Sequence, residues 1–275
     1  MKQLSFKQVD VFTARPFYGN PVAVVIGAEA LGTAAMQRIA AWTNLSETTF
    51  LLPPTKPEAS YKLRIFTPRQ ELPFAGHPTV GSAHAALESG FAKASNGGLK
   101  QECGAGVLDL TVEGARIYVR APEPKIQPVE APLFGKAQAL RVDVGPIWVV
   151  VDLGKAQAVD ALDPDMPEIE KMSHELHATG VTVFGRTGNA ATPIHVRSFA
   201  PAHGVPEDPV CGSGNVSVGA FLRQTGLLKE FGPSYTARQG MQVGRDGRVQ
   251  VRVSADAIQI GGEAVTCVDG KLRVD

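Results

Sequence analysis

Strand-like and helical hydrophobic patterns alternate along the first half of the chain. Residues 6–13 and 20–26 are predicted as strands because they are rich in β-branched and alternating apolar positions. Apolar residues then recur near helical spacing over residues 30–42, at Leu31, Ala34, Ala35, Ile39 and Trp42. Further strands are predicted at 48–52 and 61–66, and a second helix at 78–89. This order predicts a sheet accompanied by two helices.

The second predicted helix has an unusual composition. A proline stands in its first turn and Gly90 lies beyond its end, which is the expected asymmetry of helix termini. Its middle is rich in alanine, glycine and serine, and residues 77–87 carry no charged side chain other than histidine. Such a helix suits a closely surrounded interior better than a surface. We therefore expect it to lie at the centre of the first half.

The second half of the chain repeats this pattern. R-I-F-T-P at 64–68 matches R-S-F-A-P at 197–201, and each is followed by a glycine turn and a run of small residues, 76–90 and 212–226. A match this short also arises by chance. A duplicated pair of domains, however, explains the repeat together with the 29 glycines and 20 prolines, which indicate many short elements.

The remaining strands complete the predicted fold. They are expected at 106–113, 115–120, 142–152, 180–184, 248–253 and 257–260. We predict an α+β fold of two pseudo-symmetric halves, each a curved, mostly antiparallel sheet wrapped around a central helix. The halves are expected at 1–121 and 132–256, with a proline-rich linker near 121–132 and a C-terminal strand within 257–275 that can pack back on the first half.

Composition narrows the functional classes. The 275 residues carry 27 basic and 27 acidic side chains, so bulk attraction to nucleic acid or to an anionic membrane is not expected. Three cysteines, Cys103, Cys211 and Cys267, show no disulfide or zinc spacing, which favours a reducing compartment and most simply the cytoplasm. The apolar run 144–151 is far shorter than the ~20 residues of a membrane span.

Two glycine turns precede the predicted central helices. Gly76 with His77, and Gly212 with Ser213, stand where a helix N-terminus exposes backbone N–H groups and its positive dipole end. Such a turn binds anions, and a substrate carboxylate would suit it. The alternative is that these glycines only allow tight packing of the helices.

Three titratable residues lie close to these turns. Glu47 precedes an apolar strand, where partial burial would raise its pKa toward that of a general acid or base; the alternative is an exposed loop or capping carboxylate. Asp208 could bind a polar substrate group or orient His77, or simply form a turn before proline. Its neighbour Glu207 competes for these roles. Cys211 at a helix N-terminus could be a thiolate base, or a small buried residue.

Four ordered blocks resemble the phenazine-biosynthesis PhzF-like isomerase family. They are V-D-V-F-T-A-R-P-F-Y-G-N-P-V-A-V-V at 9–25, L-S-E-T-T-F at 45–50, R-I-F-T-P-R-Q-E-L-P-F-A-G-H-P-T-V-G at 64–81 and E-D-P-V-C-G-S-G-N at 207–215. The resemblance implies the diaminopimelate-epimerase-like fold, with the active site between the two halves. It also implies proton transfer at carbon without a cofactor or metal, a small carboxylated substrate, and a homodimer.

The resemblance also assigns roles to particular residues. Glu47 matches the acid/base of the S-E-T-T-F block, and Gly76 and His77 match the A-G-H-P-T block. Asp208 and Ser213 match the E-D-P-x-x-G-S block. On this pattern Glu47, His77 and Asp208 are the expected catalytic residues. Gly76, Cys211, Gly212 and Ser213 are expected to bind the substrate.

The sequence departs from its relatives at two positions. Diaminopimelate epimerases place a cysteine before each glycine turn, whereas this chain has Ala75 at the first and Cys211 at the second, where PhzF-like proteins more often carry threonine. Three functions therefore stay open. They are a one-base isomerase using Glu47, a two-base amino-acid racemase or epimerase using Glu47 and Cys211, and a catalytically inactive ligand-binding protein of the same fold.

Overall fold

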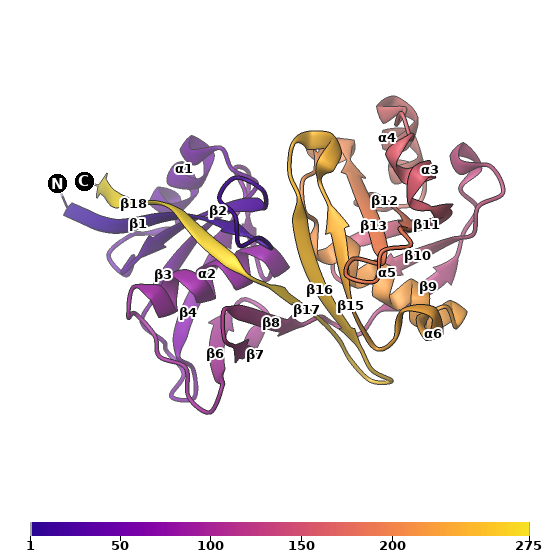
Figure 1. Ribbon diagram of the computed structural model, residues 1–275. Helices are drawn as coiled ribbons and strands as arrows, with labels where there is room; N and C mark the ends of the chain where they lie inside the picture. The colour runs from indigo at the N-terminus through magenta and orange to yellow at the C-terminus, as the bar shows by residue number, and fades with distance from the viewer. Residues whose placement is uncertain (1, 275) are drawn as a thin grey trace. The chain divides into compact units, whose positions relative to one another are not determined.

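The computed structural model describes residues 2–274, which form two compact units of similar construction (Figure 1). The first unit contains the chain up to Arg120 together with the residues from Gly261 onward. The second contains Ala121–Ile260. The chain thus leaves the first unit once and returns to it with its C-terminal strand.

The first unit contains two helices and a curved sheet. Its helices are α1 (Thr33–Thr43) and α2 (Gly76–Glu88). Its strands are β1 (Lys2–Val11), β2 (Asn20–Ile26), β3 (Thr48–Leu52), β4 (Tyr61–Phe66), β5 (Glu71–Leu72), β6 (Gly98–Cys103), β7 (Gly106–Glu113), β8 (Arg116–Arg120) and β18 (Ala264–Val274).

The second unit contains helices α3 (Ala156–Asp160), α4 (Met166–Glu175), α5 (Gly212–Thr225) and α6 (Leu228–Phe231). Its strands are β9 (Lys125–Pro128), β10 (Ala139–Asp143), β11 (Ile147–Lys155), β12 (Gly180–Arg186), β13 (Ile194–Ala200), β14 (Val205–Asp208), β15 (Ser234–Gln239) and β16 (Gly247–Val253). Strand β17 (Ile258–Gly262) spans the boundary between the units.

Strand pairing follows the same plan in both units. In the first, β1 pairs antiparallel with β2, β2 parallel with β3, β3 antiparallel with β4, and β4 parallel with β6. In the second, β10 pairs antiparallel with β11, β11 parallel with β12, β12 antiparallel with β13, and β13 parallel with β15. The predicted α+β fold of two pseudo-symmetric, mostly antiparallel halves is confirmed.

A helix of small residues forms the centre of each unit. Helix α2 packs against β1, β2, β3, β4, β8 and β18, and α5 packs against β10, β11, β12 and β16. Nine of the residues of α2 and ten of those of α5 are buried, which explains why neither helix carries a charged face. The sheets hold the N-terminus of each central helix in place, and the predicted site residues lie there.

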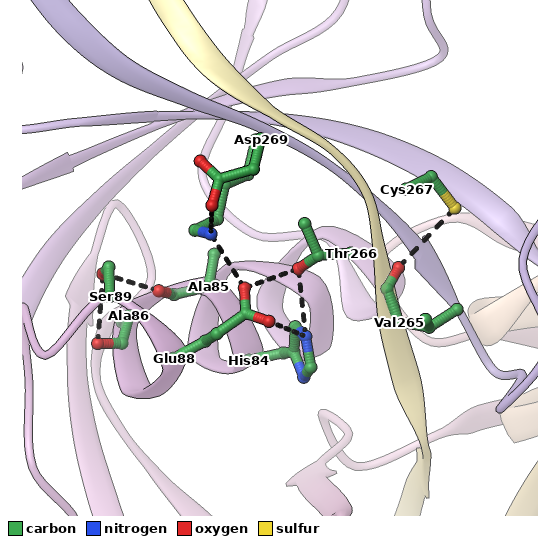
Figure 2. Close-up of polar contacts among 10 residues, drawn as sticks. His84, Ala85, Ala86, Glu88, Ser89, Val265, Thr266, Cys267 and Asp269 are labelled. Atoms are coloured by element: carbon green, nitrogen blue, oxygen red, sulfur yellow. Dashed lines mark hydrogen bonds and ion pairs between the residues drawn. The ribbon is translucent and has the colours of Figure 1, made fainter.

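The C-terminal strand is fastened to the first unit by a charged network as well as by backbone pairing. Strand β18, yellow in Figure 1, pairs antiparallel with β1 along its length. The buried ammonium of Lys7 lies 2.9 Å from a Glu88 oxygen and donates to Asp269 at 2.7 Å. Figure 2 shows the Glu88 carboxylate accepting from Thr266 at 2.6 Å and lying beside His84. Helix α2 is thereby joined to β18.

The structure corrects two sequence expectations in the second unit. Residues 142–152 are not one strand, because Gly145 (φ +98°) turns the chain between β10 and β11 and donates its N–H to the Asp143 side chain. The predicted linker near 121–132 contains β9, which pairs antiparallel with β10. Prolines at its margins therefore border a short edge strand, where missing N–H donors are tolerated.

The first helix forms where the sequence predicts it, but its apolar residues are not all buried. The buried positions of α1 are Met36 and Ala40, four residues apart, and Trp42 lies 77% exposed. Trp42 follows Met36 by six residues, about 240° around the helix, so the two side chains face different sides. None of the helices within residues 2–274 combines the length and the apolar character that crossing a membrane requires.

Candidate active site

The strongest candidate site in the first unit is a carboxylate facing a histidine. Glu47 lies just before β3, and the N–H of Ala23 on β2 donates to its backbone oxygen at 3.4 Å. One carboxylate oxygen, Oε2, lies 3.4 Å from Nε2 of His77. Only 16% of the Glu47 side chain and 7% of the His77 side chain are exposed. The two side chains are therefore held close together in a nearly dry environment.

Burial sets the protonation of Glu47. Removal of the carboxylate from water raises its pKa above the ordinary value of 4.5, and a hydrogen bond from Ser46 offsets this only in part. The direction agrees with the sequence-based expectation for Glu47, whose alternative was an exposed loop carboxylate. A carboxyl group whose pKa is raised toward neutrality can both accept and return a proton.

The N-terminus of α2 places His77 at this carboxylate. Ala75 is the N-cap residue in an extended conformation (φ −153°, ψ 140°), and its methyl side chain supplies no capping hydrogen bond. Gly76 and His77 are the first two residues of the helix, and Pro78 needs no N–H partner in the first turn. The helix therefore begins without a side-chain cap, directly beside Glu47.

In the second unit, four of the predicted site residues lie at the N-terminus of α5. Cys211 is the N-cap, and its Sγ accepts from the N–H of Gly214 at 3.3 Å. Gly212 and Ser213 are the first two helical residues, and the Ser213 Oγ lies 3.6 Å from the Cys211 Sγ. Asp208 precedes this turn, and its Oδ1 accepts from the N–H of Val210 at 3.1 Å.

Of the two interpretations of Cys211, a thiolate base or a small buried residue, the surroundings of the side chain favour the second. Cys211 is 3% exposed, and its pKa lies well above the ordinary thiol value because of burial first and the nearby Asp208 carboxylate second. Hydrogen bonds from Ser213 and Gly214 oppose this rise but do not outweigh it. Burial therefore outweighs the helix dipole here and favours the protonated thiol.

Glu207 is assigned a different role from Asp208. Its two oxygens accept from Nε and a terminal nitrogen of Arg197, both at 2.9 Å, in a bidentate ion pair. The side chains are 5% and 7% exposed, for Arg197 and Glu207 respectively. A carboxylate committed in this way fastens β14 to β13. Asp208 forms the turn that the alternative interpretation expected, which leaves its predicted catalytic role untested.

Two residues of this region gave no signal in the sequence. Gln239, fully buried at the end of β15, accepts from the N–H of Cys211 and from Asn215, and donates to the backbone oxygen of Asp208. Trp148 on β11 donates its indole N–H to Ser213 Oγ at 2.9 Å. Both lie far from the turn in sequence and reach it only through the sheet.

The predicted residues therefore form one group in each unit. Glu47, Gly76 and His77 meet at the start of α2, and Asp208, Cys211, Gly212 and Ser213 meet at the start of α5. No cluster of three or more His, Cys, Asp or Glu side chains with metal-binding geometry occurs among residues 2–274. What these two groups can supply is a titratable acid/base and a set of hydrogen-bond donors.

Comparisons with known proteins point to one family. A family model of phenazine biosynthesis-like proteins, PhzC-PhzF, matches residues 9–270. The chain is 41% identical to antisense-enhancing sequence 1 of Schizosaccharomyces pombe, over 98% of this chain and 99% of that one. It is 32% identical to trans-2,3-dihydro-3-hydroxyanthranilate isomerase of Pseudomonas fluorescens, over 96% and 97%. The crystal structure of a PhzF-family protein from Bacillus anthracis superposes with a TM-score of 0.89, at 26% identity and full coverage of both chains.

Proposed function

Because the chain belongs to the PhzC-PhzF family of phenazine biosynthesis-like proteins, a family of isomerases, we propose that it moves a proton between carbons of a small carboxylated substrate, with Glu47 as general acid/base. The observation that carries this proposal is the buried contact between Glu47 and His77 at 3.4 Å. Among residues 2–274, Glu47 is the carboxylate whose pKa burial raises, and it lies beside the start of the central helix of the first unit.

The proposed reaction is a proton shift with no net change in composition. The Glu47 carboxylate takes a proton from an activated carbon of the substrate, and the bonding electrons move into the neighbouring π-system. The same carboxyl group then returns the proton to another carbon of that system. A raised pKa serves both steps, because it makes the carboxylate a stronger base for the first step while the carboxyl group still gives its proton up in the second.

His77 supports Glu47 in this scheme. A neutral imidazole carries one donor and one acceptor nitrogen, so Nε2 can donate to the carboxylate or accept from the carboxylic acid. This contact is 3.4 Å long, longer than an ordinary charge-assisted hydrogen bond, so it holds the carboxyl group less firmly than a short ion pair would. The start of α5, with Ser213, carries hydrogen-bond donors of the kind that bind a carboxylate. The catalytic role of Asp208 remains a prediction.

The two-base alternative needs a second base at Cys211. The raised thiol pKa and the burial of this side chain count against that role, since only the thiolate is an effective base. In the ligand-binding alternative, the scaffold would retain Glu47, His77 and Asp208 without using them. Neither alternative is favoured by a particular contact in the structure.

The decisive experiment follows deuterium exchange at carbon. The protein is incubated in D₂O with a panel of small unsaturated acids, including trans-2,3-dihydro-3-hydroxyanthranilate, and with both enantiomers of the common amino acids. Mass spectrometry then locates the label. We expect wild type to incorporate deuterium and Glu47→Gln to lose at least about a thousandfold in rate, since a side-chain amide is neither an effective acid nor an effective base at neutral pH.

Two further variants sharpen this experiment. Glu58→Gln, which alters an exposed carboxylate in the loop between β3 and β4, is the matched control and should exchange at the wild-type rate. Cys211→Thr should remain active if one base suffices, whereas a two-base racemase would lose turnover. Undiminished exchange in Glu47→Gln would contradict the assignment of the acid/base.

A further inference from the structure

The shared strand register allows the two units to be compared position by position. Phe66 lies opposite Thr48 in the first unit, and Phe199 lies opposite Val181 in the second. Thr48 and Val181 therefore occupy equivalent places, and so do the residues that precede them, Glu47 and Gly180. By the same register, Val22 corresponds to Trp148, because Ala23 lies opposite Thr48 and Val149 lies opposite Val181. At the helix starts, His77 corresponds to Ser213.

The second unit has no space for an acid at the position that corresponds to Glu47. A Cβ added at Gly180 would overlap the backbone oxygen of Phe199, a contact that no side chain can make. The neighbouring strand supplies a side chain instead. Trp148 is 3% exposed, and its Nε1 donates to Ser213 Oγ at 2.9 Å. Each unit thus has a polar contact to the second residue of its central helix, but only the first unit uses a titratable group.

This contact determines what the Ser213 hydroxyl can do. A serine hydroxyl has one proton and two acceptor lone pairs, whereas an indole N–H only donates. Trp148 therefore occupies one acceptor position of the oxygen. The Cys211 Sγ lies 3.6 Å from Ser213 Oγ, but it already accepts from the N–H of Gly214, and a thiol sulfur is only a weak acceptor. A substrate carboxylate is a stronger acceptor than this sulfur and has no proton to donate, so it can take the hydroxyl proton of Ser213 in preference to the sulfur.

We propose that Trp148 is a positioning residue: its indole N–H orients the Ser213 hydroxyl so that this hydroxyl donates to the substrate carboxylate at the start of α5. The inference rests on the proposed function, because that function supplies the carboxylated substrate. It adds a residue that touches no substrate and that sets the preference for an acid over an uncharged analogue. It also explains why a bulky aromatic side chain is buried at this point of β11.

The hydrogen bond itself is tested by NMR without any turnover. The chain has two tryptophans, so ¹⁵N-labelled protein gives two indole signals, and that of the exposed Trp42 serves as an internal control. Ser213→Ala should shift the Trp148 signal and accelerate its hydrogen exchange, and should leave the Trp42 signal in place. A Trp148 signal that stays unchanged in Ser213→Ala would overturn the proposal.

Ligand preference is tested with 3-hydroxyanthranilate and its methyl ester. This acid is the aromatic counterpart of the compound in the name of the Pseudomonas fluorescens relative. In wild type, the acid at millimolar concentration should shift the backbone amide signals of Ser213 and Gly214. Trp148→Phe, which keeps an aromatic ring, should weaken binding of the acid about tenfold and leave binding of the ester nearly unchanged. Trp42→Phe is the matched control.

The remaining outcomes also decide the matter. Equal weakening of acid and ester in folded Trp148→Phe would show a packing role only, and the proposal would fail. Wild-type amide signals that do not respond to the acid would equally overturn it. If Trp148→Phe unfolds, Ser213→Ala is expected to show the same loss of acid preference. The proposed function fails separately, if Glu47→Gln keeps its deuterium exchange, because the NMR and binding measurements need no proton transfer.

Discussion

The two units contain the same arginine–glutamate pair in different surroundings. Arg64 on β4 donates to Glu71 through Nε and a terminal nitrogen at 2.7 and 2.6 Å, as Arg197 on β13 does to Glu207 at 2.9 Å. Each guanidinium also lies about 5 Å from the ring of the phenylalanine two residues on, Phe66 or Phe199. The side chains of the first pair are 21% and 39% exposed, those of the second only 5% and 7%.

This difference shows how a duplicated plan diverges. The Arg-x-Phe-x-Pro motif produces the same local geometry twice. In each unit the arginine lies on a long strand, β4 or β13, and the glutamate lies on the short strand that follows it, β5 or β14. The degree of burial then sets how much each ion pair contributes to the free energy of unfolding. Arg197 also donates to the backbone oxygens of Val159 and Leu162, so it holds the end of α3 as well as β14. Arg64 likewise donates to Thr33 and Met36 on α1, but its pair with Glu71 stays closer to water.

The largest expected effect concerns these carboxylates. Glu207→Gln should lower the free energy of unfolding by about 3 kcal/mol, because it leaves the Arg197 guanidinium buried without a full counter-charge. Glu71→Gln, the equivalent change in the more exposed pair, should cost under about 1 kcal/mol. Urea unfolding followed by circular dichroism measures both. Equal losses in the two variants would show that burial does not distinguish the pairs.

A second prediction concerns Glu47, whose equivalent position in the second unit is Gly180. Burial raises the pKa of Glu47 above its unfolded value of 4.5, so the folded state holds this proton more tightly than the unfolded state does. Wild type then loses stability as the pH rises from 4.5 through the folded-state pKa, with a slope of about 1.4 kcal/mol per pH unit between the two pKa values. Glu47→Gln lacks this loss.

Glu47→Gln should therefore be more stable than wild type at about pH 7.5 and equal to it at about pH 4, where both states are protonated. Urea unfolding at the two pH values tests this, with Glu58→Gln as the control that should track wild type at both. A Glu47→Gln protein less stable than wild type at neutral pH would contradict the cost assigned to this buried carboxylate.

The smallest effects are expected at the helix caps. Cys211→Ala removes the acceptor for the Gly214 N–H and should lower the unfolding free energy by about 1 kcal/mol, whereas Cys211→Ser keeps an acceptor and should lose less. Ala75→Ser adds a cap at the equivalent place in the first unit and should raise stability by up to about 1 kcal/mol.

Ala75→Ser should also weaken catalysis if the start of α2 binds an anionic group. A serine oxygen would occupy a backbone N–H of the first turn, and KM would rise while the protein became more stable. Thermal unfolding together with the deuterium-exchange assay measures both quantities. A stabilised variant with unchanged KM would show that this helix start takes no part in binding.

Local patterns predicted most of the first unit. Strands β2, β3, β4 and β7 begin and end where the alternation and β-branched residues placed them, and α2 was predicted within two residues at its start. The errors came where a local signal had two interpretations. Residues 142–152 are apolar throughout except at Asp143, Gly145 and Asp152, and the turn at Gly145 was hidden within that run. The prolines of 121–132 suggested a linker, although a short strand lies between them.

The sequence by itself determined the α+β plan of two similar halves and the two helix N-termini, and it singled out the residues proposed for acid/base chemistry and anion binding. These follow from hydrophobic periodicity, glycine turns and short motifs, which act over a few residues. The tertiary structure decided the burial that raises the pKa values of Glu47 and Cys211, and it brought Trp148 and Gln239 to the start of α5. Burial and contacts between strands depend on how distant segments pack, and no local pattern records that packing.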